Sequence, residues 1–98
     1  MKVYMYFEWS EIKNHVNYEK HGVWFEEAQT VWTTGSSVEF YDPEHSFEIE
    51  DRFIRIGLSE KLNLLLVVFC ERADGTVIRI ISSRRATLKE RVQYEKGI

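Results

Sequence analysis

The chain has 98 residues, of which 44% are hydrophobic and 14% aromatic, and its net charge is −3. This length predicts one domain over residues 1–98, and the composition argues against an intrinsically disordered chain. We expect neither a signal peptide nor a membrane span, because Glu8 interrupts the N-terminal segment and the longest apolar run, residues 64–70, is strand-sized. The single cysteine, Cys70, excludes an internal disulfide and fits a reducing cytoplasm.

The charge is distributed unevenly along the chain. Residues 1–70 hold six Lys/Arg and twelve Asp/Glu, a balance of −6, whereas residues 71–98 hold seven Lys/Arg and four Asp/Glu, a balance of +3. A uniformly basic nucleic-acid-binding domain is therefore excluded. The basic C-terminal segment leaves room for a local anion site, although solvated surface charge would explain the same pattern.

Two helices are predicted in the first third of the chain, after a strand over residues 3–8 with alternating aromatic side chains. The first helix is expected over residues 11–20. Ile12 and Val16 are four residues apart, so we expect them on its buried face. The second helix is expected over residues 25–32, where glutamates in the first turn precede an apolar stripe.

Four strands are predicted next. A short strand over residues 37–42 should end at Pro43, because proline cannot donate to the ladder. A polar loop then leads into a strand over residues 52–58. The nearly continuous apolar run of residues 62–70 predicts a central strand that is covered on both faces.

The dipeptide Asp74-Gly75 is a strong hairpin signal and predicts a return strand over residues 76–82. A capping box from Thr87 to Glu90 then opens a C-terminal helix, whose inner face we expect to carry Leu88 and Val92. The predicted order is β-α-α-β-β-β-β-α. This is an α+β fold with two N-terminal helices packed on a curved antiparallel sheet.

Arg79 lies inside the apolar alternation of the predicted return strand. If Asp74-Gly75 is the hairpin loop, Arg79 lies opposite Cys70. A cation that faces a core needs a partner. The residue beside Cys70 on the preceding strand depends on the turn, which leaves Glu50, Asp51 or Arg52. An ion pair with an acidic neighbour is the ordinary explanation for Arg79.

A second explanation is a polyanion site on the concave face of the sheet. Arg52, Arg72 and Arg79 fall on consecutive predicted strands, and Arg84 and Arg85 follow where the sheet meets the N-terminus of the last helix. Guanidinium groups and helix N-termini both suit phosphate. The pattern favours RNA or DNA as the ligand.

Three longer pieces of sequence are more specific than any of these signals. They are "KHGVWFEEA" (residues 20–28), "DPEHSFEIEDRFIRIG" (42–57) and "RIISSRRATLKERVQYE" (79–95). In order and spacing the chain from Phe7 to Glu95 resembles the BrnT toxin family. Two small departures are Ser10, where members often have Asp, and Ser83, where many have Ala.

The resemblance implies a RelE-like ribonuclease fold and the toxin half of a bacterial toxin–antitoxin pair. Such a toxin cleaves RNA and blocks translation. Its partner is expected to be a BrnA-like antitoxin of ribbon-helix-helix type, in a heterotetramer that contacts operator DNA only through the antitoxin. We expect no cofactor and no membrane partner.

Metal-free RNA cleavage needs a base for the 2′-hydroxyl, cations for the phosphorane and an acid for the leaving 5′-oxygen. We expect His45 or Glu50 as the base, and Arg79 and Arg84 (or Arg85) as the groups that stabilise the transition state. Contacts with RNA are expected from Lys20, His21, Arg52, Arg72 and Arg85, and either of the first two could also be the acid. No metal site is expected, because His15 and His21 lie off a common helical face.

Each of these assignments has a structural alternative. His21 could cap the first helix, His45 could be an ordinary loop residue, and Glu50 and Arg52 could form a cross-strand ion pair. Two functional hypotheses therefore stand. One is an endoribonuclease toxin, and the other is a non-catalytic module that binds an antitoxin or nucleic acid.

Overall fold

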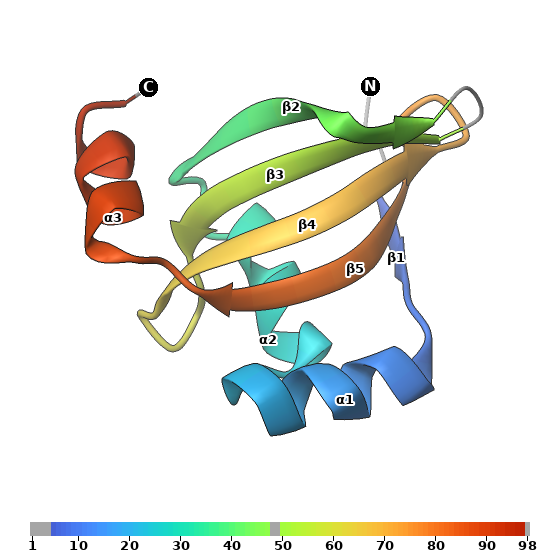
Figure 1. The fold of residues 1–98 in the computed structure, drawn as a ribbon, viewed down its shortest axis with the longest axis horizontal. Helices are drawn as coiled ribbons and strands as arrows, with labels where there is room; N and C mark the ends of the chain where they lie inside the picture. The colour runs from blue at the N-terminus through green and yellow to red at the C-terminus, as the bar shows by residue number, and fades with distance from the viewer. Residues whose placement is uncertain (1–4, 48–49, 98) are drawn as a thin grey trace.

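The computed structural model describes residues 5–47 and 50–97, and within these ranges the side chains of residues 43–50 lie outside the description. The element order is β-α-α-η-β-β-β-β-α, where η is a 3-10 helix (Figure 1). The elements are β1 (Tyr6–Glu8), α1 (Glu11–His21), α2 (Phe25–Ala28), η1 (Gln29–Trp32), β2 (Ser37–Phe47), β3 (Glu50–Leu58), β4 (Leu64–Arg72), β5 (Val77–Arg85) and α3 (Leu88–Glu95).

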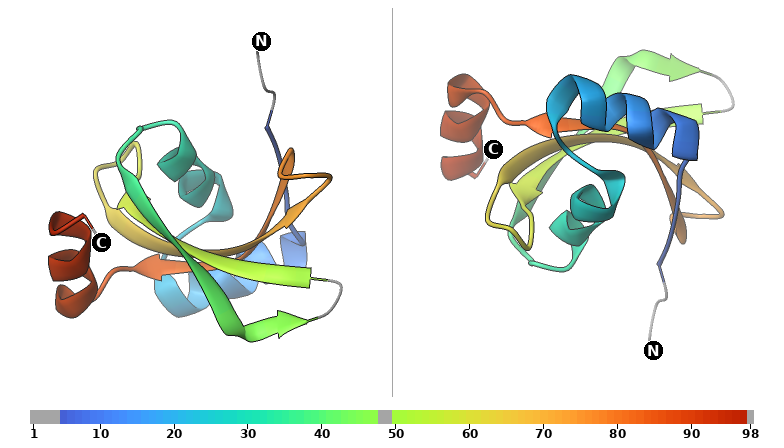
Figure 2. Two further views of the ribbon diagram at one scale, coloured as in Figure 1. Left: turned by 90° about the horizontal axis from the view of Figure 1, so that it is seen from above. Right: turned by 90° about the horizontal axis from the view of Figure 1, so that it is seen from below.

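The described residues form one five-stranded sheet with the order β1-β5-β4-β3-β2. Strands β2 to β5 make an antiparallel meander, while β1 pairs with β5 in parallel. The sheet is strongly curved, and α2 and η1 cover one face, which we call the inner face (Figure 2). The opposite, convex face is called the open face, and the concave face, where we expected a polyanion, is the one that α2 and η1 cover (Figure 2). The α+β prediction is confirmed, but the sheet is not wholly antiparallel as expected.

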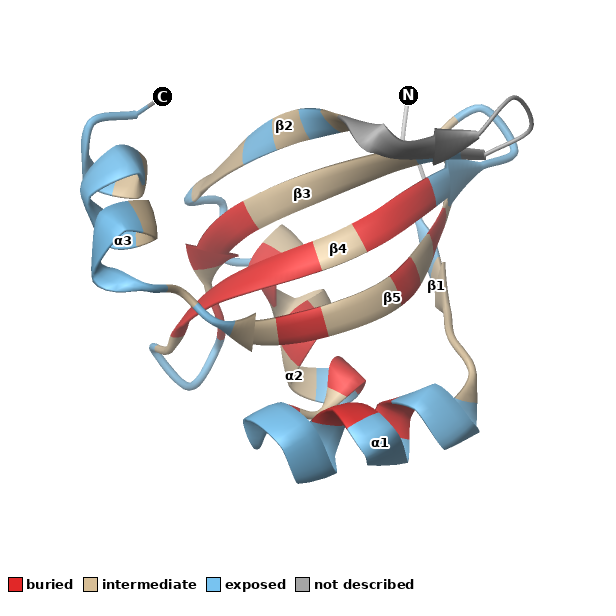
Figure 3. Ribbon diagram, in the orientation of Figure 1, coloured by how far each residue is buried: buried red, intermediate tan, exposed pale blue. Residues whose placement is uncertain are grey.

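Two apolar clusters stabilise the sheet. The inner cluster joins α2 and η1 to β4 and β5, and the buried members are Val23, Phe25, Ala28, Val31, Leu65, Val67, Phe69, Ile78 and Ile80. A smaller cluster, Ile56, Leu64 and Leu66, lies on the open face, where Tyr94 of α3 packs against it. Strand β4 is therefore buried on both faces, as its apolar run predicted (Figure 3).

The edge strand β2 continues through Pro43, so the expected strand end at this proline is wrong. β2 is the edge strand of the described sheet and pairs only with β3. An edge strand tolerates proline, because a missing N–H on its outer side removes no hydrogen bond between strands. The register between the two strands shifts between Asp42 and Phe47. The segment after Pro43 that we expected to be a loop therefore extends the hairpin.

Helix α1 lies along the outer edge of β5, whereas we expected both N-terminal helices on the sheet face (Figures 1 and 2). Its buried residues are Asn14 and Asn17, while Ile12 and Val16 are 79% and 42% exposed. The expected apolar inner face is therefore wrong. The physical reason is that the edge of β5 beyond the short β1 presents backbone groups that need hydrogen-bonding partners.

Asn17 supplies these partners. Its Nδ2 donates to the Ser83 carbonyl over 2.8 Å and to the Val23 carbonyl over 2.9 Å, and its Oδ1 accepts from the Ser83 N–H over 3.0 Å. Asn14 Oδ1 accepts from the Phe25 N–H over 2.8 Å. The amides of α1 thus replace a missing strand neighbour and fix the start of α2.

Helix α3 projects beside the end of the sheet, and none of its residues is buried (Figure 3). Its capping box between Thr87 and Glu90 is present, as predicted. Leu88 and Val92 are 78% and 43% exposed, so the expected inner face is wrong. Tyr94 makes the apolar contact instead, and its hydroxyl hydrogen-bonds with the Ser36 hydroxyl.

Candidate functional site

A β-bulge in β5 decides which arginines share a face. From the Cys70–Arg79 pair to the Leu66–Arg84 pair, β4 advances by four residues and β5 by five, and Ile81 is the extra residue. Strict alternation would place Arg79 and Arg84 on opposite faces. The bulge reverses the alternation, as bulges do when they re-aim a side chain, and brings both arginines to the open face.

Charged residues form a row across the open face. The row runs Glu8, Arg79, Cys70, Arg52, Asp42 from β1 to β2. Arg79 lies opposite Cys70, which confirms the register predicted from the hairpin signal. Of the alternatives left open on β3, Arg52 is the residue beside Cys70. The thiol is completely buried between two arginine positions.

The acidic partner of Arg79 is Glu8. Arg79 Nη1 lies 3.4 Å from Glu8 Oε2, and Arg72 Nη1 lies 3.8 Å from Glu8 Oε1. Sequence reasoning looked for this partner on β3 and missed Glu8, because the parallel pairing of β1 with β5 joins positions 71 residues apart. One carboxylate therefore holds two of the expected site arginines side by side.

Next to this row the open face contains a cavity of about 410 Å³, which we call the open-face hollow. Its floor is apolar and is formed by Ile54, Leu66 and Val68 of the two central strands. The polar residues that border it are His21, Asp42, Arg52, Ser82, Ser83, Arg84 and Glu90. The hollow thus combines two guanidinium groups, one imidazole and two carboxylates.

Arg84 is held by a fork of hydrogen bonds to Glu90. Its Nη1 and Nη2 donate to Glu90 Oε1 and Oε2 over 2.7 and 2.8 Å, and the Thr87 N–H also donates to Glu90 over 2.8 Å. The hydrogen bonds from Arg84 hold the pKa of Glu90 at about 2, below its usual 4.5. The same contact raises the pKa of Arg84.

The structure brings only part of the expected site together. His21, Arg52 and Arg84 border the hollow, and Arg72 and Arg79 lie beside it on the same face. The side chains of two further candidates, His45 of β2 and Glu50 of β3, lie outside the described part of the structure.

Two expected RNA contacts do not border the hollow. Lys20 is exposed on α1, one residue before His21. Arg85 pairs with Leu65 of the inner cluster, so strand alternation places it on the inner side of β5. The bulge that turns Arg84 toward the open face turns its neighbour away.

Sequence reasoning missed two carboxylates of the hollow, Asp42 and Glu90. Asp42 was interpreted as the end of a strand, yet it pairs with Arg52 in the β2–β3 ladder. Glu90 was recognised only as a helix cap. Its spacing of six residues from Arg84, across a strand–helix junction, is the one sequence signal that pointed to the second role.

The arrangement suits chemistry at a phosphodiester. Guanidinium forks bind phosphate oxygens, and an imidazole beside carboxylates can transfer protons. Among the side chains that the structure describes, no three from His, Cys, Asp or Glu are grouped so that they could hold a metal ion. No helix in the described part of the chain is long and apolar enough to cross a membrane.

Fold and hollow together define a small α+β protein with an arginine-bordered cavity on an open sheet face. Residues 9–90 match the family described as the ribonuclease toxin, BrnT, of type II toxin–antitoxin systems. The chain therefore belongs to the BrnT family of ribonuclease toxins. Its target class is RNA, and its family implies an antitoxin partner.

The crystal structure of the Brucella abortus ribonuclease toxin, BrnT, is similar to this chain. The TM-score is 0.66 and the sequence identity is 26%, over 85% of this chain and 97% of that one. No curated protein matches the sequence.

Proposed function

We propose that the open-face hollow is the ribonuclease site and that it cleaves RNA without a metal ion. The main support is the bulge in β5, which puts Arg84 on the same face as Arg52 and Arg79. His21 from the end of α1 and Asp42 from β2 border the same hollow. Membership of the BrnT family indicates ribonuclease activity. The hollow contains side chains suited to that reaction.

In the proposed reaction a base removes the proton from a 2′-hydroxyl, whose oxygen then attacks the adjacent phosphorus. The O2′–P bond forms, the P–O5′ bond breaks, and an acid donates a proton to the leaving O5′. The products are a 2′,3′-cyclic phosphate and a 5′-hydroxyl. We propose His21 and Asp42, which both border the hollow, as proton-transfer groups, and His45 and Glu50 stay candidates for the base.

Arg52 and Arg84 would neutralise the charge that grows on the phosphorane oxygens. The fork to Glu90 orients the Arg84 guanidinium before substrate binds, so little reorganisation is needed in the transition state. Arg79 and Arg72 continue the cationic row toward the next phosphate. The exposed Lys20 and Arg85 are proposed as contacts for flanking RNA.

The proposal extends to the cellular role. We infer one RelE-like toxin domain over residues 1–98 that acts in the cytoplasm, blocks translation and is neutralised by a BrnA-like ribbon-helix-helix antitoxin. The two would form a heterotetramer that binds operator DNA only through the antitoxin. The support for these points is the family match and the sequence resemblance.

The test is cleavage of end-labelled RNA by the purified protein, in EDTA and in Mg²⁺. We expect cleavage in EDTA with 2′,3′-cyclic phosphate ends, and a rate about 10²- to 10³-fold lower for Arg84→Ala. Arg91→Ala makes the same charge change at an exposed position of α3 and should leave the rate within about threefold.

Three results would overturn parts of the proposal. Cleavage only with Mg²⁺ would reject the metal-free reaction. Equal rates for Arg84→Ala and Arg91→Ala would reject the hollow as the site. RNA that stays intact both on and off ribosomes would favour a non-catalytic binding module.

A further inference from the structure

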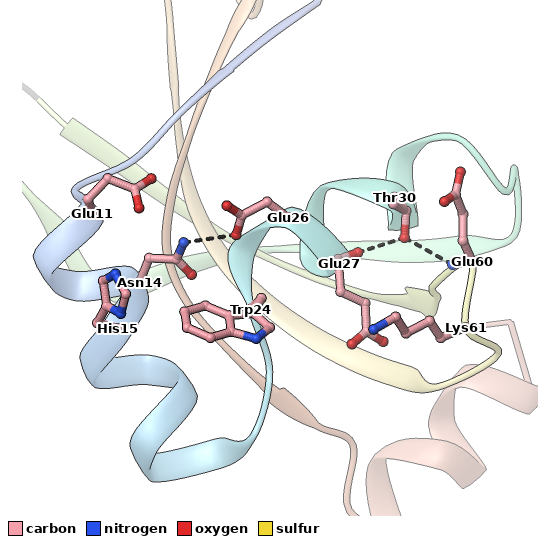
Figure 4. A pocket seen from close by; sticks show the side chains of 9 residues that line it. All are labelled: Glu11, Asn14, His15, Trp24, Glu26, Glu27, Thr30, Glu60 and Lys61. Carbon is pink, nitrogen blue, oxygen red and sulfur yellow. Dashed lines mark hydrogen bonds between the residues drawn. The ribbon is translucent and has the colours of Figure 1, made fainter.

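A second cavity, of about 500 Å³, lies between α1, the segment at Trp24, α2 and the turn that joins β3 to β4 (Figure 4). It shares no lining residue with the open-face hollow. Four carboxylates border it, from Glu11, Glu26, Glu27 and Glu60. We call it the acidic pocket.

One wall of the acidic pocket is a fixed aromatic ring. Tyr18 stacks on the Trp24 indole at 4.1 Å between ring centroids, and His15 meets it edge-on at 5.3 Å. Tyr18 thus covers one face of the indole, while the rest of the ring borders the pocket. A ring held on two sides offers a preformed surface for a cation or an apolar chain.

Two of the carboxylates are also held in place. Asn14 Nδ2 donates to Glu26 Oε1 over 2.8 Å. Ser59 Oγ and Asn63 Nδ2 donate to Glu27 Oε2 over 2.7 and 2.9 Å. These donors are neutral, so they orient the two carboxylates without cancelling their charge, and Lys61 is the one cationic residue in the lining.

The charge of the lining excludes anions such as RNA. Four carboxylates face one ammonium group, that of Lys61, among the lining residues. The volume falls within the usual range for small-molecule sites. The carboxylates stand around the cavity without the close grouping that a metal ion needs. An extended organic cation therefore fits the spacing of these carboxylates better than a metal ion does.

We propose that the acidic pocket binds an organic cation, a guanidinium or primary ammonium group on a short apolar chain. The cationic head would pair with Glu26, the Glu60 carboxylate would add to the attraction from across the pocket, and the chain would pack on Trp24. Both a free cation and a basic side chain of a protein carry this chemistry. The site is independent of RNA cleavage, because it lies apart from the open-face hollow.

The probe is agmatine, which joins a guanidinium and an ammonium group by four carbons, with neutral N-butylurea as the matched control. Titration of the ¹⁵N-labelled full chain should shift the Trp24 indole N–H and the Glu26 and Glu60 amides with agmatine only. The peptide Gly-Arg-Gly, with capped ends, is the second arm. Tighter binding of this peptide indicates a protein side chain as the source, and tighter binding of agmatine a free cation.

Two double variants of equal net charge distinguish binding in the acidic pocket from general electrostatic attraction of the ligand to the protein. Glu26→Gln with Glu60→Gln keeps the fold, because Gln still accepts from Asn14, and should weaken binding at least about tenfold. Glu19→Gln with Glu95→Gln changes the net charge equally at exposed positions away from the pocket and should bind as the parent protein. Equal affinity of the two double variants, or no shift at Trp24, would overturn the proposal.

Discussion

At the scale of single residues, Glu90 has two structural roles. It closes the capping box of α3 through the Thr87 N–H and holds the Arg84 guanidinium in a fork. Its pKa is about 2 in the folded protein and near 4.5 when unpaired. A depressed carboxyl pKa contributes stability above the unfolded value, and this contribution is lost as the pH falls from about 4.5 to 2.

Glu90→Gln should therefore lower the free energy of unfolding at pH 6 and have little effect at pH 2. The expected loss at pH 6 is about 1 kcal/mol, because Arg84 is 37% exposed and water screens the pair. Gln can still serve in the capping box, so helix capping is kept. Urea unfolding at both pH values measures the difference, and Glu95→Gln serves as an exposed control. A loss that is equal at the two pH values would refute the fork as its cause.

Glu8 is the second informative residue, because its carboxylate lies beside both Arg72 and Arg79. Glu8→Gln should leave these guanidinium groups more attractive to phosphate. We predict about fivefold tighter RNA binding at low salt, measured by fluorescence anisotropy with 2′-O-methyl RNA. Glu19→Gln, on the exposed surface of α1, is the charge-matched control. Tighter binding by the control to the same extent would mean that only net charge matters.

At the scale of elements, the amides of α1 act as the neighbour that β5 lacks beyond β1. Asn17 alone makes three hydrogen bonds to backbone groups, two of them to Ser83 next to the bulge. The bulge in turn decides the face of Arg84. The position of α1 is thereby linked to the geometry of the hollow, where its last residue, His21, also lies.

Asn17→Ala should destabilise the protein by about 3 kcal/mol, since it leaves the buried N–H and C=O of Ser83 without their partner. Ile12→Ala on the same helix should change stability by less than about 0.5 kcal/mol, because the side chain is exposed. Chemical denaturation of the two variants measures both values. A larger loss of stability for Ile12→Ala than for Asn17→Ala would support the apolar inner face of α1 that the sequence pattern favoured.

The elements differ in how far their sequences predict them. The apolar run of β4 and the Asp74-Gly75 turn act locally, so the central strand and the Cys70–Arg79 register follow from sequence. The bulge at Ile81 has no local signature, and the arginine faces could not be assigned without it. The buried face of α1 could not be predicted either. Asn17 of this face hydrogen-bonds to backbone groups of β5 that have no strand neighbour, and this need arises only in the tertiary structure.

At the scale of the whole molecule, cationic and acidic regions are separated. The open face carries the arginine row and the hollow, while the acidic pocket lies among α1, α2 and the β3–β4 turn. The net charge of −3 conceals this separation. Under the proposed function, a phosphate chain would be attracted to one region and repelled by the other, and RNA would lie along the curved open face.

The most direct measurement follows the arginine Nε–H resonances of the ¹⁵N-labelled protein as uncleavable 2′-O-methyl RNA is added. Bound RNA on the open face should shift the resonances of Arg52, Arg79 and Arg84. Arg55, which lies on the inner side opposite Val67 and over the Trp32 ring, should not move. Shifts at Arg55 with none at Arg52 and Arg84 would contradict the assignment of the open-face hollow as the RNA site.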